Sequence, residues 1–253
     1  MSTFHHTLAL FTRGLRHILR SPDTIITVAI MPIALLLLFV YVLGGAIQTG
    51  AGNYVNYLLP GILLIAIASG VSYTALRLFN DIQSGIFNRL LSMPVSRTAV
   101  LWSHVLTSLV SNAISVLAII LIALLIGFRP SAGPLGWLAA LGILALFTLA
   151  LTWIAVLPGL IAKSTDGAAA FSYPLIFLPF ISSAFVPTQT MPTALRLFAQ
   201  NQPVTSIVNT LRALLTNQPV GNSIWIALGW CLLILILFYL LSMRIYNRRL
   251  RNS

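Results

Sequence analysis

The sequence is poor in acidic residues and in cysteine. Its 253 residues contain three aspartates and no glutamate, and charged residues of both signs make up only 7% of the chain. The single cysteine, Cys231, has no second thiol with which to form an internal disulfide. The histidines and acids do not show the spacing of a metal site. These absences argue against a metal centre and against an intramembrane enzyme with a nucleophile and a base.

The three aspartates, Asp23, Asp81 and Asp166, lie at the ends of apolar segments or between them. Ion-coupled transporters usually carry an ionisable group inside the membrane, because such a group is costly there and is kept for function. An ion-coupled secondary transporter is therefore a weak alternative for this chain.

Long apolar runs dominate the rest of the sequence. Hydrophobic residues make up 58% of the chain, and its mean hydropathy is +0.99. A helix of roughly 20 apolar residues crosses the ~30 Å hydrocarbon core of a bilayer and satisfies its own backbone hydrogen bonds. The runs predict an all-α integral membrane protein that forms a single transmembrane domain over residues 1–253. Its six predicted membrane spans are residues 24–44, 57–76, 105–126, 135–157, 168–186 and 224–243.

Basic residues are distributed unevenly around these spans. If the N-terminus is cytoplasmic, eleven of the fourteen lysines and arginines lie in cytoplasmic segments. The positive-inside rule then predicts a multi-pass protein with both termini in the cytoplasm, and we expect a prokaryotic cell membrane. The formal charge of +11 is explained by attraction to anionic membrane lipids, so no nucleic acid is expected as a partner.

Residues 1–20 predict an amphipathic helix that lies in the membrane interface. Apolar residues recur there at spacings of three and four, and arginines occupy the other faces. Such a helix serves either as a membrane anchor or as a contact for a cytoplasmic partner. The residues that define its two faces best are Phe11, Arg13, Arg16 and Arg20.

The two longest connections also have helical patterns. In the predicted cytoplasmic loop 77–104, Ile86, Leu90 and Leu91 form one apolar face of a short helix that Pro94 ends. The predicted extracellular loop 187–222 contains two apolar groups, each too brief to cross the bilayer. We expect two short helices there, at the extracellular end of a pathway.

Three sets of residues suggest chemistry. Residues 159–165 contain a lysine followed by a serine, but Ala162 replaces the glycine of a phosphate-binding loop and a membrane helix precedes it, so nucleotide binding there is rejected. The third span carries a polar stripe that favours helix packing, with a substrate surface as the alternative. The fifth span is aromatic, and either packs or lines an apolar route. The candidate substrate-pathway residues are Ser111, Asn112, Tyr173, Phe177 and Phe180.

The order of these segments resembles that of a type 2 ABC exporter permease, and drug-resistance permeases of the daunorubicin and doxorubicin type are the most similar. The cytoplasmic loop resembles the coupling-helix region of that family through Asp81, Gly85, the pair Arg89 and Leu90, and residues 94–97. The extracellular loop resembles the family through residues 201–205, which read NQPVT, and residues 212–215, which read RALL.

The resemblance implies a non-catalytic transmembrane subunit that binds no cofactor itself. It implies a second permease copy, as a homodimer or heterodimer, and two cytoplasmic ATPase subunits that hold ATP and Mg. The cargo is expected to be an amphipathic or hydrophobic drug, lipid-like molecule, peptide or glycan moved outward. A membrane immunity or regulatory binding protein without transport remains the main alternative.

The resemblance also assigns expected roles to particular residues. The expected ATPase-coupling residues are Asp81, Gly85, Ile86, Asn88, Arg89, Leu90, Leu91, Pro94 and Arg97. The expected extracellular gate consists of Pro203, Thr205 and Arg212.

Overall fold

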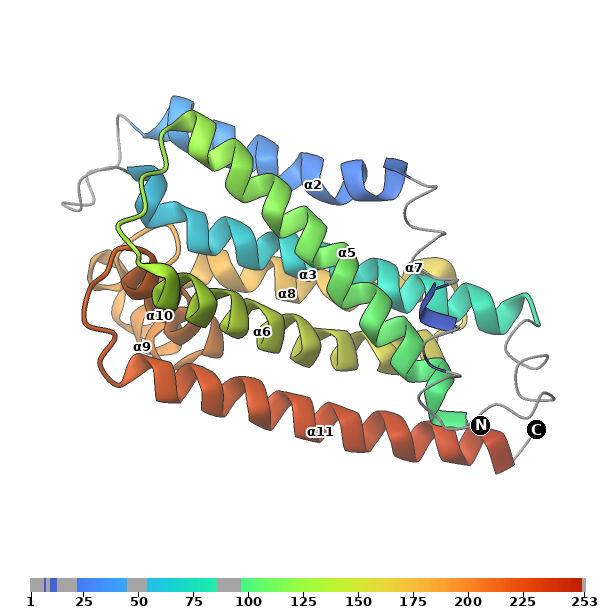
Figure 1. The fold of residues 1–253 in the computed structure, drawn as a ribbon. Coiled ribbons are helices and arrows are strands. Elements are labelled where there is room, and N and C mark those ends of the chain that lie inside the picture. Colours follow the sequence, from blue (N-terminus) through green and yellow to red (C-terminus); the bar gives the residue numbers. More distant parts are fainter. Residues whose placement is uncertain (1–6, 8–9, 13–21, 45–53, 86–96, 252–253) are drawn as a thin grey trace.

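The computed structural model describes residues 7, 10–12, 22–44, 54–85 and 97–251, and within these residues all regular secondary structure is helical. Four helices are long and apolar enough to cross a membrane, and they pack into an elongated bundle (Figure 1). The all-α membrane architecture expected from the apolar runs is confirmed. These four helices are α3 (Tyr54–Gln83), α5 (Arg97–Ile126), α6 (Pro134–Ile161) and α11 (Ser223–Arg251).

The first predicted span corresponds to two consecutive helical elements. Helix α2 (Pro22–Leu37) leads directly into the π-helical turn η1 (Leu38–Leu43). Pro32 lies inside α2 and has no backbone N–H, so one hydrogen bond of that helix is missing.

The fifth predicted span, residues 168–186, is interrupted in the structure. Helix α7 (Thr165–Ala170) is followed by α8 (Ser172–Phe177) and by the 3-10 turn η2 (Leu178–Ile181). Ser164 caps α7, because its Oγ accepts a hydrogen bond from the Gly167 backbone N–H at 3.1 Å. Pro179, which lacks a backbone donor, lies within η2 and contributes to the end of regular α-helix there.

Short helices occupy the segment between the fifth and sixth predicted spans. They are η3 (Thr188–Thr190), α9 (Thr193–Asn201) and α10 (Pro203–Leu215). Pro203 stands at the first position of α10, where a missing N–H costs nothing. Both α9 and α10 lie where the sequence predicts two short helices.

Helix α3 forms the centre of the bundle. Its side chains from Leu58 to Ala68 are almost fully shielded, and α2, α5, α6, α7, α8 and α10 all pack against it. Helix α11 packs along α6 and leaves a long apolar face uncovered, including Trp225, Leu233 and Ile236. An apolar surface of this extent is typical of a helix that contacts lipid.

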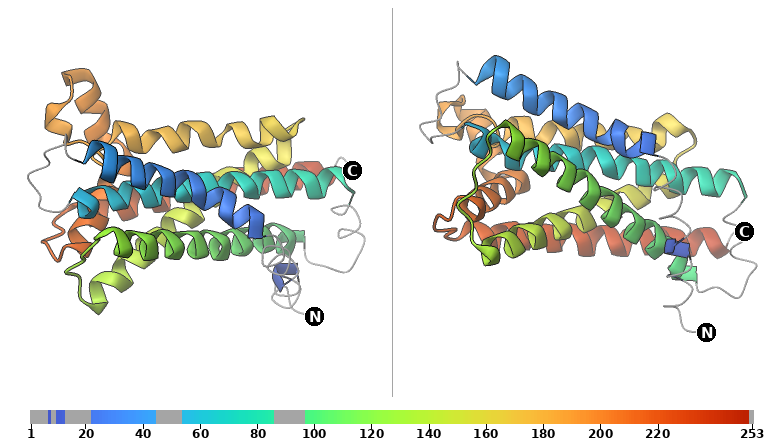
Figure 2. Two further views of the ribbon diagram at one scale, coloured as in Figure 1. Left: turned by 90° about the horizontal axis from the view of Figure 1, so that it is seen from above. Right: turned by 45° about the horizontal axis from the view of Figure 1, so that its top comes forward.

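Helices α2, α3, α5 and α6, the unit from α7 to η2, and α11 run in alternating directions and bring distant segments together at each end of the bundle (Figures 1 and 2). One end, here called the terminal end, holds residues 10–12, the end of α3, the start of α5, α7 and the end of α11. The opposite end, here called the α10 end, holds α9, α10 and residues 127–133, which connect α5 to α6. The two ends differ in chemistry and are described separately below.

Candidate functional site

Gly85 ends the helical part of α3 at the terminal end. Its backbone has φ +70°, a left-handed conformation that glycine adopts without a Cβ penalty, and its N–H donates to the Ile82 carbonyl at 3.3 Å. A Cβ added at Gly85 would meet no atom within 4 Å. Glycine is therefore required here by the backbone angle and not by lack of space. Among the other expected coupling residues, Ile86, Asn88, Arg89, Leu90, Leu91 and Pro94 lie outside the described residues.

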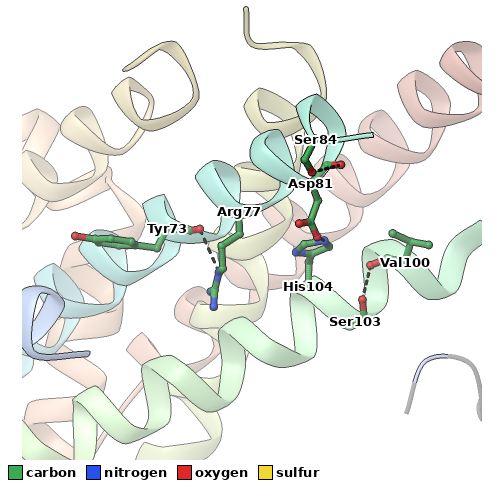
Figure 3. A network of polar contacts seen from close by, with 7 residues as sticks. All are labelled: Tyr73, Arg77, Asp81, Ser84, Val100, Ser103 and His104. Carbon is green, nitrogen blue, oxygen red and sulfur yellow. Dashed lines mark hydrogen bonds and ion pairs between the residues drawn. The ribbon is translucent and has the colours of Figure 1, made fainter. Parts of the chain in front are cut away.

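Asp81 and His104 connect α3 to α5 beside Gly85. His104 Nε2 lies 3.4 Å from Asp81 Oδ2, and the two side chains point toward each other across the gap between the helices (Figure 3). The Ser84 hydroxyl donates to the Asp81 carbonyl at 3.3 Å. Asp81 is among the expected coupling residues, but its partner His104 is not. The one feature of the sequence that relates the two residues is that both lie beside the same polar loop. Arg97, another expected coupling residue, is the first residue of α5, the helix that carries His104.

A buried polar cluster lies further along the same two helices. The Thr74 hydroxyl donates to Ser108 Oγ at 2.8 Å, and Ser108 Oγ lies 3.2 Å from Thr152 Oγ1 on α6. Arg77 approaches the same Thr74 oxygen at 3.5 Å and donates from Nε to the Tyr73 carbonyl at 3.3 Å (Figure 3). The cluster joins α3, α5 and α6 through hydroxyl groups.

Asn112, one of the candidate pathway residues, belongs to this buried region. Its Nδ2 donates to the Ser108 carbonyl at 2.9 Å, and its side chain is 2% exposed. A Cβ at Gly70 would overlap Asn112 Oδ1, so this glycine allows α3 and α5 to approach closely. Ser111, on the neighbouring face, is partly buried and accepts a hydrogen bond from Ser115 at its carbonyl. These contacts are those of helix packing.

The aromatic candidates lie on a different part of the molecule. Tyr173 and Phe177 on α8 are each 61% exposed. Phe180 lies 6.2 Å from Phe177 and 5.1 Å from Phe185 between ring centroids, and Phe185 stacks on Phe39 of η1 at 4.6 Å. The structure therefore does not gather the five pathway candidates into one site: Asn112 is inside the bundle, and Tyr173 and Phe177 are on its surface.

Arg212 organises the α10 end. It donates from Nη2 to the Ser183 carbonyl at 2.7 Å, from Nε and Nη2 to the Tyr57 carbonyl at 3.2 and 3.0 Å, and from Nη1 to Asn209 Oδ1 at 3.2 Å. Its guanidinium lies 3.7 Å from the centroid of the Tyr57 ring, a cation–π geometry. Burial lowers the pKa of Arg212, and the neighbouring Tyr57 acts in the opposite direction.

The NQPVT segment forms the junction of α9 and α10. Gln202 Nε2 donates to the Leu178 carbonyl at 3.3 Å and also to the Ile181 carbonyl. The Thr205 hydroxyl donates to the Ala199 carbonyl at 2.5 Å, which holds α10 against α9. The expected gate residues Pro203, Thr205 and Arg212 all lie on α10. Gln202, which belongs to the NQPVT motif but not to the expected gate, makes a further polar contact.

Little of the expected interfacial helix falls in the described residues. Residues 10–12 are helical, and Phe11 is partly buried. Arg13, Arg16 and Arg20 lie outside the described residues.

Long apolar helices and an uncovered apolar surface define a multi-pass helical membrane protein. Residues 5–216 match the family described as ABC-2 type transporter, and the chain belongs to that family. It is accordingly a permease subunit of an ABC exporter, and the family implies a partner ATPase subunit.

Relatives match over nearly the full chain. The chain is 27% identical to the daunorubicin resistance ABC transporter permease protein DrrB1 of Streptomyces coeruleorubidus, over 96% of this chain and 86% of that protein. It is 27% identical to the putative transport permease ycf38 of Cyanophora paradoxa, with 92% and 84% covered. It is 24% identical to the probable doxorubicin resistance permease DrrC of Mycobacterium tuberculosis, with 90% and 83% covered.

Proposed function

We propose that the chain provides the membrane pathway through which an amphipathic or hydrophobic molecule leaves the cell. ATP and Mg are bound by separate cytoplasmic ATPase subunits, two per transporter, and this chain performs no covalent chemistry. The relatives named for daunorubicin and doxorubicin resistance support an export role and a drug-like cargo. Lipid-like molecules, peptides and glycans are the other cargo classes that such a pathway would accept.

The proposed topology has six spans with both termini in the cytoplasm, in a prokaryotic cell membrane. Helix α2 with η1 is the first span, since residues 22–43 at ~1.5 Å per residue match the ~30 Å core. The unit α7, α8 and η2 is the fifth. The shared position of residues 10–12 and the end of α11 supports placing both termini on one side (Figure 1).

A second permease copy covers the interrupted fifth span in this proposal, as a homodimer or a heterodimer. Backbone that departs from regular helix is tolerated at membrane depth only where protein covers it or where it lines a water-filled cavity. In the single chain Tyr173, Pro174 and Phe177 are exposed on this unit. These exposed side chains of α8, between α7 and η2, support a protein neighbour or a substrate cavity there.

The terminal end is the proposed contact for the ATPase subunits. The observation that carries this proposal is the pairing of Asp81 with His104, which joins the last turns of α3 to the first turns of α5, the two helices that residues 86–96 connect. We propose that ATPase movement acts on that segment, with Gly85, Arg89 and Arg97 among the coupling residues. The amphipathic residues 1–20 are proposed to contact lipid headgroups or the same partner.

The α10 end is the proposed exit for the cargo. Pro203, Thr205 and Arg212 hold α10 against neighbouring segments and form the proposed extracellular gate. The candidates for the substrate route are still Ser111, Asn112, Tyr173, Phe177 and Phe180. The three aromatic residues would contribute to it through a surface shared with the second copy.

Gentle purification from native membranes tests the assignment. The tagged chain is isolated, companion proteins are identified by mass spectrometry, and ATP hydrolysis of the eluate is measured. We expect a stoichiometric companion with a phosphate-binding loop, and hydrolysis that is lost when the lysine of that loop is replaced. A chain that is pure and inactive toward ATP in several mild detergents, and after crosslinking in the membrane, would favour an immunity or regulatory binding protein.

A further inference from the structure

Arg212 carries a positive charge that no acidic side chain neutralises within the described residues. Every hydrogen bond that its guanidinium donates there goes to a neutral oxygen: the carbonyls of Tyr57, Ser183 and Ala184, and the side-chain amide of Asn209. The three acids of the sequence belong to the first turn of α2, to the end of α3 and to α7. These segments lie at the terminal end of the bundle, opposite α10 (Figure 1).

The carbonyl groups that Arg212 binds include two that immediately follow the fifth-span unit. The last carbonyls of a helix have no partner inside it, and they carry partial negative charge. Gln202 takes the carbonyls of Leu178 and Ile181 in η2, and Arg212 takes those of Ser183 and Ala184 just beyond it. Two side chains from the start and the last turn of α10 therefore cap the end of the interrupted span.

The same guanidinium also binds the first turns of α3. The Tyr57 carbonyl accepts from Arg212, and the Tyr57 ring lies beneath the cation. One turn further along α3, a Cβ at Gly61 would lie 2.5 Å from the Ala184 Cβ, so the segment after η2 is already in close contact with this helix. Arg212 thus joins three segments: α3, the end of the fifth-span unit, and α10.

We propose that Arg212 is a positioning residue that holds the end of the fifth-span unit against α3 while the exit is closed, and that its carbonyl contacts are exchanged for water when the exit opens. The proposal rests on the proposed transport function and specifies how its extracellular gate is held. A cation bonded only to neutral oxygens suits this role, because opening does not require an ion pair to be separated and each carbonyl contact has a water equivalent.

A cysteine reporter measures this opening directly. Replacing Cys231 with alanine removes the only native thiol, and Ser183→Cys then places a buried thiol next to Arg212. The purified permease–ATPase complex in lipid vesicles is treated with a membrane-impermeant maleimide from the α10 side, and the labelling rate is recorded without nucleotide and with the ATP-bound state trapped. We expect labelling to rise on trapping.

Two substitutions are expected to change the labelling rate in opposite directions. Arg212→Lys keeps the charge but loses the forked donor geometry, so labelling without nucleotide should rise by about tenfold, the effect of losing one such hydrogen bond. Asn209→Asp keeps the acceptor at 3.2 Å from Arg212 and adds a carboxylate, so labelling should fall and should respond less to trapping. Arg196→Lys on α9 is the matched control and should change nothing.

The response of labelling to nucleotide trapping separates a gate from a merely stabilising contact, which would not respond to nucleotide. The proposal is overturned if labelling does not rise on trapping, or if Arg212→Lys and Asn209→Asp both leave labelling unchanged or shift it in the same direction. If Arg212→Lys does not assemble, Asn209→Asp decides, because it retains the acceptor oxygen used by Arg212. ATP hydrolysis by the unsubstituted complex is measured in parallel. If the complex does not hydrolyse ATP, the proposed function fails. The opposite changes in labelling rate of the two variants without nucleotide would still test the role of Arg212.

Discussion

His104 Nε2 and Asp81 Oδ2 lie 3.4 Å apart and join α5 to the last turns of α3. The two residues are 23 positions apart in the sequence, and residues 86–96 connect the helices that carry them. Because this pair joins the two helices near the ends of that segment, it is positioned to affect how force from a partner reaches the bundle.

Breaking the pair is expected to reduce coupling more than stability. Both side chains are partly exposed, and a polar contact between exposed side chains contributes at most about 0.2–1 kcal/mol. His104→Gln and Asp81→Asn should therefore leave membrane insertion and thermal stability nearly unchanged while lowering ATP-dependent transport severalfold. Ser84→Ala, which removes only a bond to the Asp81 carbonyl, is the control. Equal transport by all three variants would contradict a coupling role.

Gly85 is expected to tolerate asparagine better than alanine. Its φ of +70° disfavours a residue with a Cβ by ~1–2 kcal/mol, and asparagine adopts this region more readily than alanine. Gly85→Ala should impair transport with insertion intact, as should substitution of Arg89. Gly133→Ala serves as the comparison, because Gly133 has φ −74° and open space around it. ATPase activity and transport are measured on the same preparations, and full activity of Gly85→Ala would be inconsistent with this prediction.

Gly70 is expected to be intolerant of alanine because of Asn112. The added Cβ would overlap Asn112 Oδ1 and displace the buried amide, a kind of overpacking that typically costs ~1–3 kcal/mol. The shorter Asn112→Ser should restore part of the stability lost in Gly70→Ala. Gly142→Ala in α6, which meets nothing within 4 Å, should be neutral or slightly stabilising. Thermal unfolding in detergent is the measurement, and additive losses in the double variant would argue against the contact.

The aromatic residues of α8 are expected to affect cargo handling without affecting folding. Tyr173 and Phe177 are mostly exposed in the single chain, so replacing either with alanine removes little internal packing. Phe180→Ala, by contrast, removes the ring that stacks on Phe185 at 5.1 Å and should lower thermal stability. Transport of a dye-like amphipathic cargo and thermal stability are compared. Tyr173→Ala and Phe177→Ala variants that lose stability but not transport would show that these side chains only pack.

Local properties of the chain were enough to predict the helical membrane architecture. Apolar runs of about 20 residues leave a polypeptide few ways to satisfy its backbone in a bilayer, so composition and length lead directly to helices such as α3, α6 and α11. Helical periodicity predicted α9 and α10. The family motifs also include Arg212 and Asp81.

The contacts that these residues make depend on segments far away in the chain. Arg212 binds the carbonyl of Tyr57, 155 residues earlier, and backbone carbonyls carry no sequence signature. Asn112 has the same side chain whether it faces a substrate or Gly70, and its place inside the bundle follows from how α3, α5 and α6 pack together. Hydrophobic periodicity constrains which face of a helix is buried, but it does not specify the neighbour, because in a membrane both lipid and protein accept an apolar face.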